Sequence, residues 1–220
     1  MPFNQISCKT FCKRWFGCSY YTQSPSYSKT IDLIFDRTLK DQASTERPFI
    51  DCFVDHYNSR CLTGVRSIYA EDSEEFDIKC TTMAMSMSSF LSKYEAHHIR
   101  DSYLFRGRIN GRVGCIIKNE KSSYVVDFSY SNTQDTYNNI GYYKLNLYLY
   151  NITHDLTHDG MVYIPESNSY YMIKFNPSDY TIRRGFLQTI IKNRAYNPGY
   201  QCLTCEVKDC KPRLIIRRNI

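Results

Sequence analysis

Long apolar runs are absent from this 220-residue sequence, and glycine is scarce. No stretch approaches the roughly 18 consecutive apolar residues that a membrane-spanning helix requires. The opening residues, MPFNQISCKTFCKRW, lack the apolar segment of a secretory signal. We therefore expect synthesis inside a cell and no membrane partner, and we attach no meaning to the glycosylation-like triplet at 151–153.

Motifs that bind nucleotides or activate nucleophiles are also missing. The 9 glycines are scattered, and no phosphate-binding loop, dinucleotide fingerprint, nucleophile elbow or kinase signature occurs. Most catalytic sites leave one such trace in the sequence. We therefore expect a protein that is not an enzyme and that has no catalytic residues, cofactor or metal.

A concentrated basic surface is not evident either. The net charge is +6, from 28 basic and 22 acidic residues. The basic clusters lie at 9–14 and 211–218, and elsewhere the two signs are mixed. A nucleic-acid-binding domain usually carries a basic stripe, so we expect no specific nucleic-acid partner.

Tyrosine, in contrast, is abundant, with 20 residues. Its ring provides a large contact area at a small entropic cost and is enriched where proteins contact one another. Many of these tyrosines stand beside serine or asparagine. We therefore predict contacts between copies of the chain through Trp15, Tyr20, Tyr21, Tyr27, Tyr170, Tyr171 and Tyr200.

Cysteine is also frequent, with 10 residues, and three lie near each end of the chain. We predict that these six form disulfides or ties between molecules: Cys8, Cys12, Cys18, Cys202, Cys205 and Cys210. Since the cell interior is reducing, such bridges would form only after exposure to oxidising conditions. The spacing does not fix their connectivity, because six cysteines allow 15 pairings.

The C-terminal cysteines allow two further interpretations. A structural zinc site needs four ligands, and Cys202, Cys205 and Cys210 supply three, so an N-terminal cysteine would have to provide the fourth. A redox-active pair is less well supported, because Cys202 and Cys205 do not follow a strand and open a helix.

The segment THDLTHDG contains the only other pattern that suggests chemistry. A helix would place His154 and His158 on one face beside Asp155 and Asp159, where they could hold a metal ion. However, Gly160 and the strand-like residues after it indicate the end of a segment, so we favour a polar patch that is solvated or contacts another chain. His97 and His98 are adjacent and would point in different directions.

Hydrophobic periodicity predicts a helix-rich α+β domain with short β-hairpins and extended arms at both ends. Its boundaries are an N-terminal arm at 1–28, a core at 29–199 and a C-terminal arm at 200–220. Within the core we predict helices at 28–42, 81–105 and 178–199. We predict hairpins at 112–130 and 161–175, a short strand or buried turn at 49–57, a solvated acidic loop at 71–75, and an element of either type at 142–152.

In its abundance of tyrosine and cysteine, its cysteine-bearing arms and its lack of catalytic motifs, the whole chain resembles viral occlusion-body proteins, the polyhedrins, of the nudivirus type. It lacks the sequence landmarks of baculovirus polyhedrin, granulin and cypovirus polyhedrin. The resemblance implies a largely helical building block that forms a disulfide-stabilised lattice with exchanged segments. It also implies assembly in the nucleus of an infected cell, enclosure of virions, and an extracellular occlusion body that dissolves in an alkaline gut.

Alkaline release has a physical basis, because free tyrosine and lysine change charge near pH 10. Two alternatives stay open. One is a zinc-dependent nucleic-acid-binding protein that uses the C-terminal cysteines and basic tail. The other is a metal-dependent hydrolase centred on His154 and His158.

Overall fold

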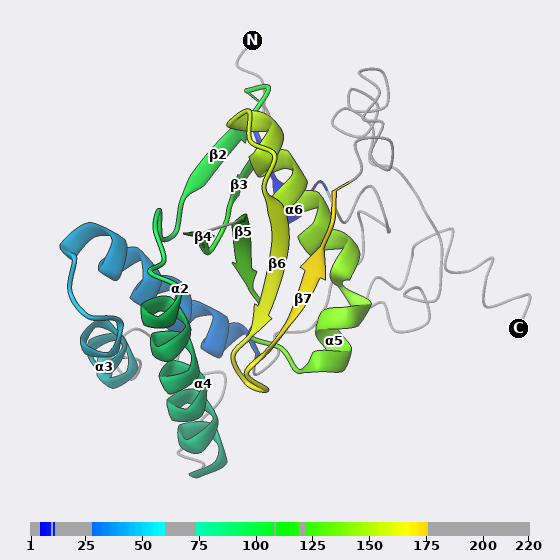
Figure 1. Ribbon diagram of the computed structural model, residues 1–220. Helices are drawn as coiled ribbons and strands as arrows, with labels where there is room; N and C mark the ends of the chain where they lie inside the picture. Colours follow the sequence, from blue (N-terminus) through cyan, green and yellow to red (C-terminus); the bar gives the residue numbers. More distant parts are fainter. Residues whose placement is uncertain are drawn as a thin grey trace, which may run out of the picture.

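The computed structural model describes residues 5–9, 11, 28–59, 74–107, 109–118 and 122–175. These residues form a mixed α+β fold with two sheets and helices on both faces of the larger one (Figure 1). The α+β prediction is confirmed. The predicted arms at 1–28 and 200–220 and the predicted helix at 178–199 lie wholly or mostly outside the described residues. Within those residues, no helix is long and apolar enough to cross a membrane.

The larger sheet has the strand order β4-β5-β6-β7. Strands β4 (Cys115–Lys118) and β5 (Ser123–Phe128) form an antiparallel pair, as do β6 (Asp159–Ile164) and β7 (Ser169–Ile173). Both predicted hairpins are therefore confirmed. The two hairpins join through β5 and β6, which are parallel. A parallel pair needs a long crossover, and α5 (Thr133–Asn138) and α6 (Ile140–Thr153) provide it.

The strands of this sheet send alternate side chains to two hydrophobic clusters. Val126 and Phe128 of β5 belong to the cluster formed with α2, α3 and α4, whereas Val125 belongs to the cluster formed with α6. This alternation is the period of two that β-strands impose. It explains why the strands contain few polar residues, since both faces of the sheet are covered.

Helices α2 (Ser28–Thr45), α3 (Phe49–Ser59) and α4 (Glu74–Lys93) cover the first face. Phe35 of α2 is fully buried and stacks on Phe49, Phe53 and Tyr130. From α4, Met83 and Met87 are fully buried in the same cluster, where their flexible side chains fill the core.

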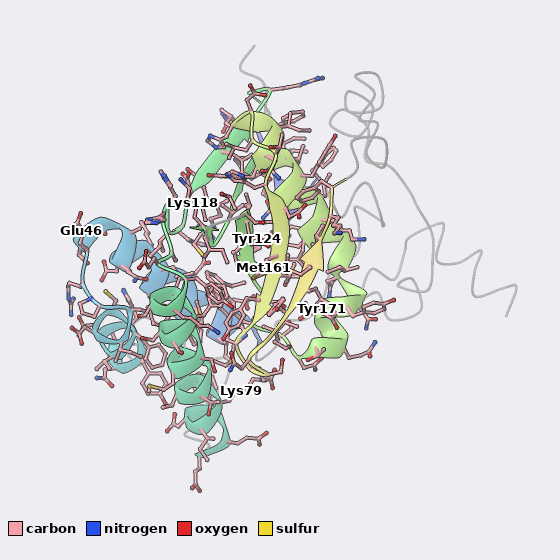
Figure 2. The ribbon with its side chains drawn as sticks, viewed as in Figure 1. Glu46, Lys79, Lys118, Tyr124, Met161 and Tyr171 are labelled. Atoms are coloured by element: carbon pink, nitrogen blue, oxygen red, sulfur yellow. The ribbon has the colours of Figure 1, made fainter. Side chains whose placement is uncertain are left out.

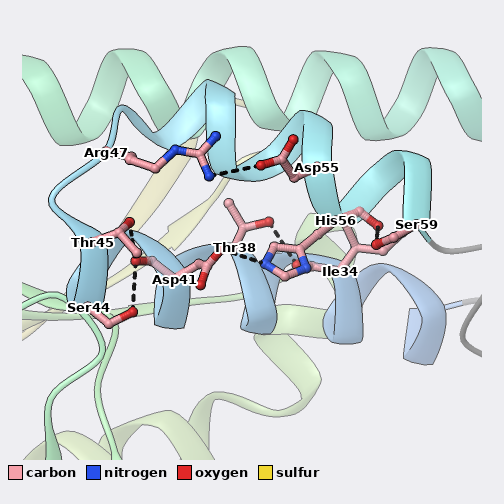
Figure 3. A network of polar contacts seen from close by, with 9 residues as sticks. All are labelled: Ile34, Thr38, Asp41, Ser44, Thr45, Arg47, Asp55, His56 and Ser59. Carbon is pink, nitrogen blue, oxygen red and sulfur yellow. Dashed lines mark hydrogen bonds and ion pairs between the residues drawn. The ribbon is translucent and has the colours of Figure 1, made fainter.

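Polar contacts join α2 to α3 on their outer side (Figure 3). His56 of α3 contacts Asp41 of α2, with 3.2 Å between Nε2 and Oδ2. Arg47, in the connection between the helices, pairs with Asp55 at 2.8 Å. Both pairs are partly or largely exposed, so each contributes little to stability.

The smaller sheet has the order β1-β3-β2 and lies in the α6 cluster. Strand β1 (Ile6–Ser7) runs parallel to β3 (Ile109–Arg112), and β2 (Ser102–Phe105) pairs with β3 in the antiparallel direction. The N-terminal segment therefore docks onto a strand roughly a hundred residues further along the chain.

Three boundary predictions are wrong or need revision. Residues 49–57 form helix α3, because Phe49, Cys52 and Phe53 are buried at helical spacing and Pro48 precedes the first turn. Helix α4 begins at Glu74, so part of the predicted acidic loop is the helix's first turn, where carboxylates are favourable. It ends at Lys93 rather than at residue 105, and residues 102–105, predicted to be helical, form strand β2. His98 is exposed, with a φ of 47°.

The segment at 142–152, whose pattern fitted a strand or a helix, belongs to α6. Leu145, Leu147 and Leu149 are all fully buried. A helix that is apolar around most of its circumference is surrounded by other elements, and α6 lies between the larger sheet and the smaller one.

Candidate functional site

A buried polar network links the two sheets at the carboxyl end of β5. Its centre is Asn146 of α6, which is fully buried. Its Nδ2 donates to Asp127 Oδ2 at 2.9 Å and to the Arg112 carbonyl oxygen at 2.8 Å. Its Oδ1 accepts from Tyr103 Oη at 2.7 Å. One amide therefore joins α6 to β5, β3 and β2.

The N-terminal segment is attached to this network through Cys8. The Cys8 side chain is 2% exposed and hydrogen-bonds to Tyr103. Burial raises the pKa of Cys8 to about 12, with the Tyr103 hydrogen bond opposing the shift. Cys8 is therefore a protonated thiol at neutral pH, and a thiol must be ionised to bind metal or attack a disulfide. Burial of the Tyr103 side chain raises the pKa of Tyr103 above the ordinary tyrosine range.

Asp127 is the ionisable group at the other end of the network. Burial raises its pKa to about 6, while hydrogen bonds from Asn146 and the Phe128 backbone N–H and the charge of Arg100 act against this shift. Asp36 of α2 raises it further. Because the pKa lies near neutrality, this carboxyl exchanges its proton in the physiological range.

Asp36 is neutralised by two arginines. It forms ion pairs with Arg100 and Arg112, and Arg100 is the more buried of the two, with 13% of its side chain exposed. Burial lowers the pKa of Arg100, and Asp36 opposes this effect. The carboxylate of Asp36 is thus paired with guanidinium groups, and that of Asp127 accepts a hydrogen bond from an amide. In the described part of the chain, no three His, Cys, Asp or Glu side chains are grouped to hold a metal ion.

Gly111 of β3 keeps Tyr103 in position. The Tyr103 ring lies directly over Gly111, and a Cβ added there would overlap its hydroxyl and ring carbons. Any larger residue would push the ring away from Asn146. The glycine that interrupts this strand therefore permits a close approach to the polar network.

Sequence reasoning missed this site. Its members, residues 8, 103, 127 and 146, are far apart in the sequence and meet only through sheet pairing and the α6 crossover. A faint signal exists, because Asn146 stands between Leu145 and Leu147, and Asp127 stands between Val126 and Phe128. A polar residue in an apolar run that is buried on all sides needs a polar partner.

The segment end predicted at THDLTHDG is confirmed, since α6 ends at Thr153 and β6 begins at Asp159. His154 caps the C-terminus of α6 and His158 directly precedes β6, so the two do not share a helical face. Asn151 Nδ2 donates to the His158 carbonyl oxygen at 2.7 Å and holds the turn closed. Burial, together with Lys118, lowers the pKa of His158.

Of the predicted contact residues, the structure describes Tyr170 and Tyr171. Both are on β7, and Tyr170 is 53% exposed while Tyr171 is half-buried beside Tyr137 of α5. Many other described tyrosines have structural roles, since Tyr103, Tyr130, Tyr150 and Tyr163 are buried. The remaining predicted contacts lie outside the described residues: Trp15, Tyr20, Tyr21, Tyr27 and Tyr200.

The predicted cysteine ties stay predictions. Cys8 is described and buried, whereas Cys12, Cys18, Cys202, Cys205 and Cys210 lie outside the described residues. No disulfide is present among the described cysteines, and Cys52, Cys80 and Cys115, like Cys8, are buried.

The two ends of the described chain pack into one hydrophobic cluster. Cys8 and Phe11, at the N-terminal end, belong to the α6 cluster, and Phe175, the last described residue, packs against it. Phe11 is fully buried. Phe175 contacts Tyr148 of α6, with 5.9 Å between ring centroids. Cys12 therefore directly follows one anchored residue, whereas Cys202 lies 27 positions beyond the other.

A substitution of Asp32, on α2, tests the electrostatics of this region. Burial raises the pKa of Asp32 to about 6, with Lys9 opposing and Asp36 reinforcing the shift. The folded state thus binds this proton more tightly than the unfolded state, and wild-type stability falls as pH rises from about 4 through 6. Asp32→Asn does not titrate. We expect its free energy of unfolding, relative to wild type, to increase by about 1 kcal/mol between pH 4 and pH 7.5. Urea denaturation at both pH values measures this difference, and an equal difference at the two would contradict it.

Comparisons with known proteins identify no family. No family model matches the chain, and no curated protein matches it. A solved structure described as "Crystal structure of SSO0001" is similar over 94% of this chain and 94% of its own, at 15% sequence identity and a TM-score of 0.40. A likeness this distant carries no argument about function.

Proposed function

We propose that the chain is a nucleic-acid-binding protein whose two ends are held together by a metal-thiolate site. Cys202, Cys205 and Cys210 supply three ligands, and Cys12 or Cys18 supplies the fourth. The observation that carries this proposal is the packing of Phe11 and Phe175 in one cluster beside α6. Cysteines at opposite ends of the sequence can then meet without any rearrangement of the described fold.

The N-terminal anchor favours Cys12 or Cys18 over Cys8. Cys8 is 2% exposed and its side chain is engaged by Tyr103 inside the α6 cluster, so it is not accessible to a ligand set at the protein surface. Cys12 directly follows Phe11, which is fixed in the core. The Tyr103–Asn146–Asp127 network thus holds the N-terminal segment in place, and the fourth ligand follows this segment in the sequence.

The chemistry of the ligands limits the metal. Four thiolates in a tetrahedral arrangement bind zinc or an iron–sulfur cluster. Both bind tightly in a reducing cell, where cysteines do not form lasting disulfides. A metal site therefore accounts for a cluster of thiols in an intracellular chain more directly than disulfides do.

Nucleic-acid binding is supported by the residues beside this cluster. Lys211, Arg213, Arg217 and Arg218 follow Cys210 within eight positions. A metal site would hold this basic segment in a fixed place on the protein. Lysine and arginine side chains neutralise phosphates, and the affinity then falls as the salt concentration rises.

Metal analysis combined with a binding assay tests the proposal. Wild-type protein purified without oxygen should contain zinc or iron, and Cys205→Ser should lose most of this metal. Anisotropy with a 30-nucleotide DNA, single- and double-stranded, should show binding that weakens with salt. We expect Cys205→Ser to weaken this binding at least about tenfold, equivalent to about 1.4 kcal/mol. Thr204→Ala is the matched control and should retain both properties. Wild-type protein without metal would overturn the metal site, and metal-containing protein without DNA binding would overturn the function.

Self-assembly into an occlusion body is a second candidate, favoured by the exposure of Tyr170 and Met172 on the edge strand β7. Alkaline release would depend on exposed tyrosines, since burial raises the pKa of Tyr163 to about 12 and raises those of Tyr143 and Tyr150 further. We expect native particles to persist at pH 7 and dissolve by pH 11, faster with a thiol reductant. Protein that stays soluble and monomeric at pH 7 would exclude this candidate.

A further inference from the structure

Four aromatic side chains form a strip between α5, α6 and β7. The strip consists of Tyr137 of α5, Tyr148 of α6, and Tyr171 and Phe175 on or after β7. Tyr137 contacts Tyr171 with 6.3 Å between ring centroids, and Tyr148 contacts Phe175 at 5.9 Å. In Figure 2, Tyr171 lies beside β7 on the side of α5. The strip therefore runs along the junction of the crossover helices with the edge of the larger sheet.

This aromatic strip is only partly covered by the described residues. Tyr137 is 60% exposed, and Tyr148, Tyr171 and Phe175 are half-buried. Ile152, on the same helix as Tyr148 and one turn further along, is 42% exposed. Among the described residues, β7 is the last strand of its sheet. Several adjacent large apolar side chains that are partly exposed mark a docking surface.

We propose that residues 178–199 of the same chain occupy the aromatic strip. Their sequence predicts a helix that begins at Ser178 and stops at Asn197-Pro198-Gly199. Ile182, Phe186, Ile190 and Ile191 give this helix an apolar stripe, which needs a surface to pack against. The strip supplies that surface, and Phe175, the last described residue, is part of it.

The short connection decides between this segment and a second copy of the protein. Only residues 176 and 177 separate Phe175 from the predicted helix. A tether of this length gives an effective concentration in the millimolar range, well above that of a free second chain in ordinary solution. The predicted helix is also long enough, since the 18 residues between Ser178 and Asn197 span about 27 Å and α6, with 14 residues, spans about 21 Å.

This inference is independent of the proposed metal site. It concerns how the chain runs after β7, and it holds whether Cys202, Cys205 and Cys210 bind metal, form disulfides or stay reduced. Its consequence is that the start of the C-terminal cysteine segment is fixed relative to α6.

Photo-cross-linking of the full-length protein tests the proposal. p-Benzoylphenylalanine in place of Tyr137 is expected to form a cross-link within one chain to a peptide from 178–199, which mass spectrometry identifies. The matched control places the same group at Tyr170, which is also exposed on the β6–β7 hairpin but faces the opposite side of the sheet. The photoreactive group at position 170 should give at least about fivefold less of the cross-link to 178–199.

Two variants of the segment make the result specific. Phe186→Asp should reduce the Tyr137 cross-link at least fivefold, whereas Gln188→Asp, on the opposite side of the predicted helix, should leave it unchanged. A cross-linked dimer would assign the strip to a second copy and overturn the proposal. Cross-links only to peptides outside 178–199, or none, would overturn it as well.

Discussion

Phe35→Ala is expected to lower the free energy of unfolding by about 3 to 5 kcal/mol, the largest effect of any single substitution considered. Phe35 is fully buried and stacks on rings from α3 and from the residues after β5, at 6.3 Å to Phe49, 5.5 Å to Phe53 and 5.0 Å to Tyr130. Alanine would leave a cavity among side chains that belong to three separate elements. Urea denaturation followed by circular dichroism measures the loss.

Leu33→Ala is the matched control for this experiment. Leu33 lies two residues away on the same helix and is 36% exposed. Its truncation removes less buried surface and leaves no closed cavity, so we expect a loss of about 1 kcal/mol or less. If the two variants are equally stable, the ring cluster does not hold α2, α3 and the sheet together as described.

Asn146→Ala should cost about 2 to 4 kcal/mol, because the partners of the amide stay buried without it. Tyr103 Oη would lose its acceptor, and Asp127 and the Arg112 carbonyl would lose a donor. We also expect a local effect. With Tyr103 released, the Cys8 thiol should react with iodoacetamide at least about tenfold faster under native conditions, since local opening governs access to buried groups.

Mass spectrometry of the tryptic peptide that ends at Lys9 measures this reactivity directly. Asn110→Ala, at an exposed position of β3, is the control and should change neither stability nor alkylation by a comparable amount. Faster alkylation of Cys8 with unchanged stability would show that the network holds only the N-terminal segment. Lower stability with unchanged alkylation would contradict the link between Asn146 and Cys8.

The sequence predicts local structure well where one periodicity dominates. Strands β4 to β7 alternate or are uniformly apolar and are separated by turn residues, and α2 has apolar residues at helical spacing, so these elements were predicted correctly. The segment at 49–57 was not, because Phe49, Cys52 and Phe53 in an eleven-residue helix are too few to distinguish helix from a short strand.

The polar network could not be predicted for a different reason. Local sequence patterns carry no information on which residues meet across sheets. The contact of Tyr103 with Asn146 requires the antiparallel β2–β3 register, the β5–β6 crossover and a glycine at position 111. Of its members, only Cys8 was among the predicted residues, and for a different role, because an asparagine within a leucine-rich helix belongs to no recognisable motif.

The pairing of Ile6 with Ile109 has a consequence for synthesis on the ribosome. The residues of β1 leave the ribosome before their partner strand, which follows only after roughly a hundred more have been translated, and such long-range pairings form slowly. Until then, Phe11 and Cys8 have no pocket, and the nascent chain exposes them to chaperones and to oxidants. Strand β1 is thus made well before the strand that pairs with it, and oxidation of Cys8 during this interval should lower the yield of native protein.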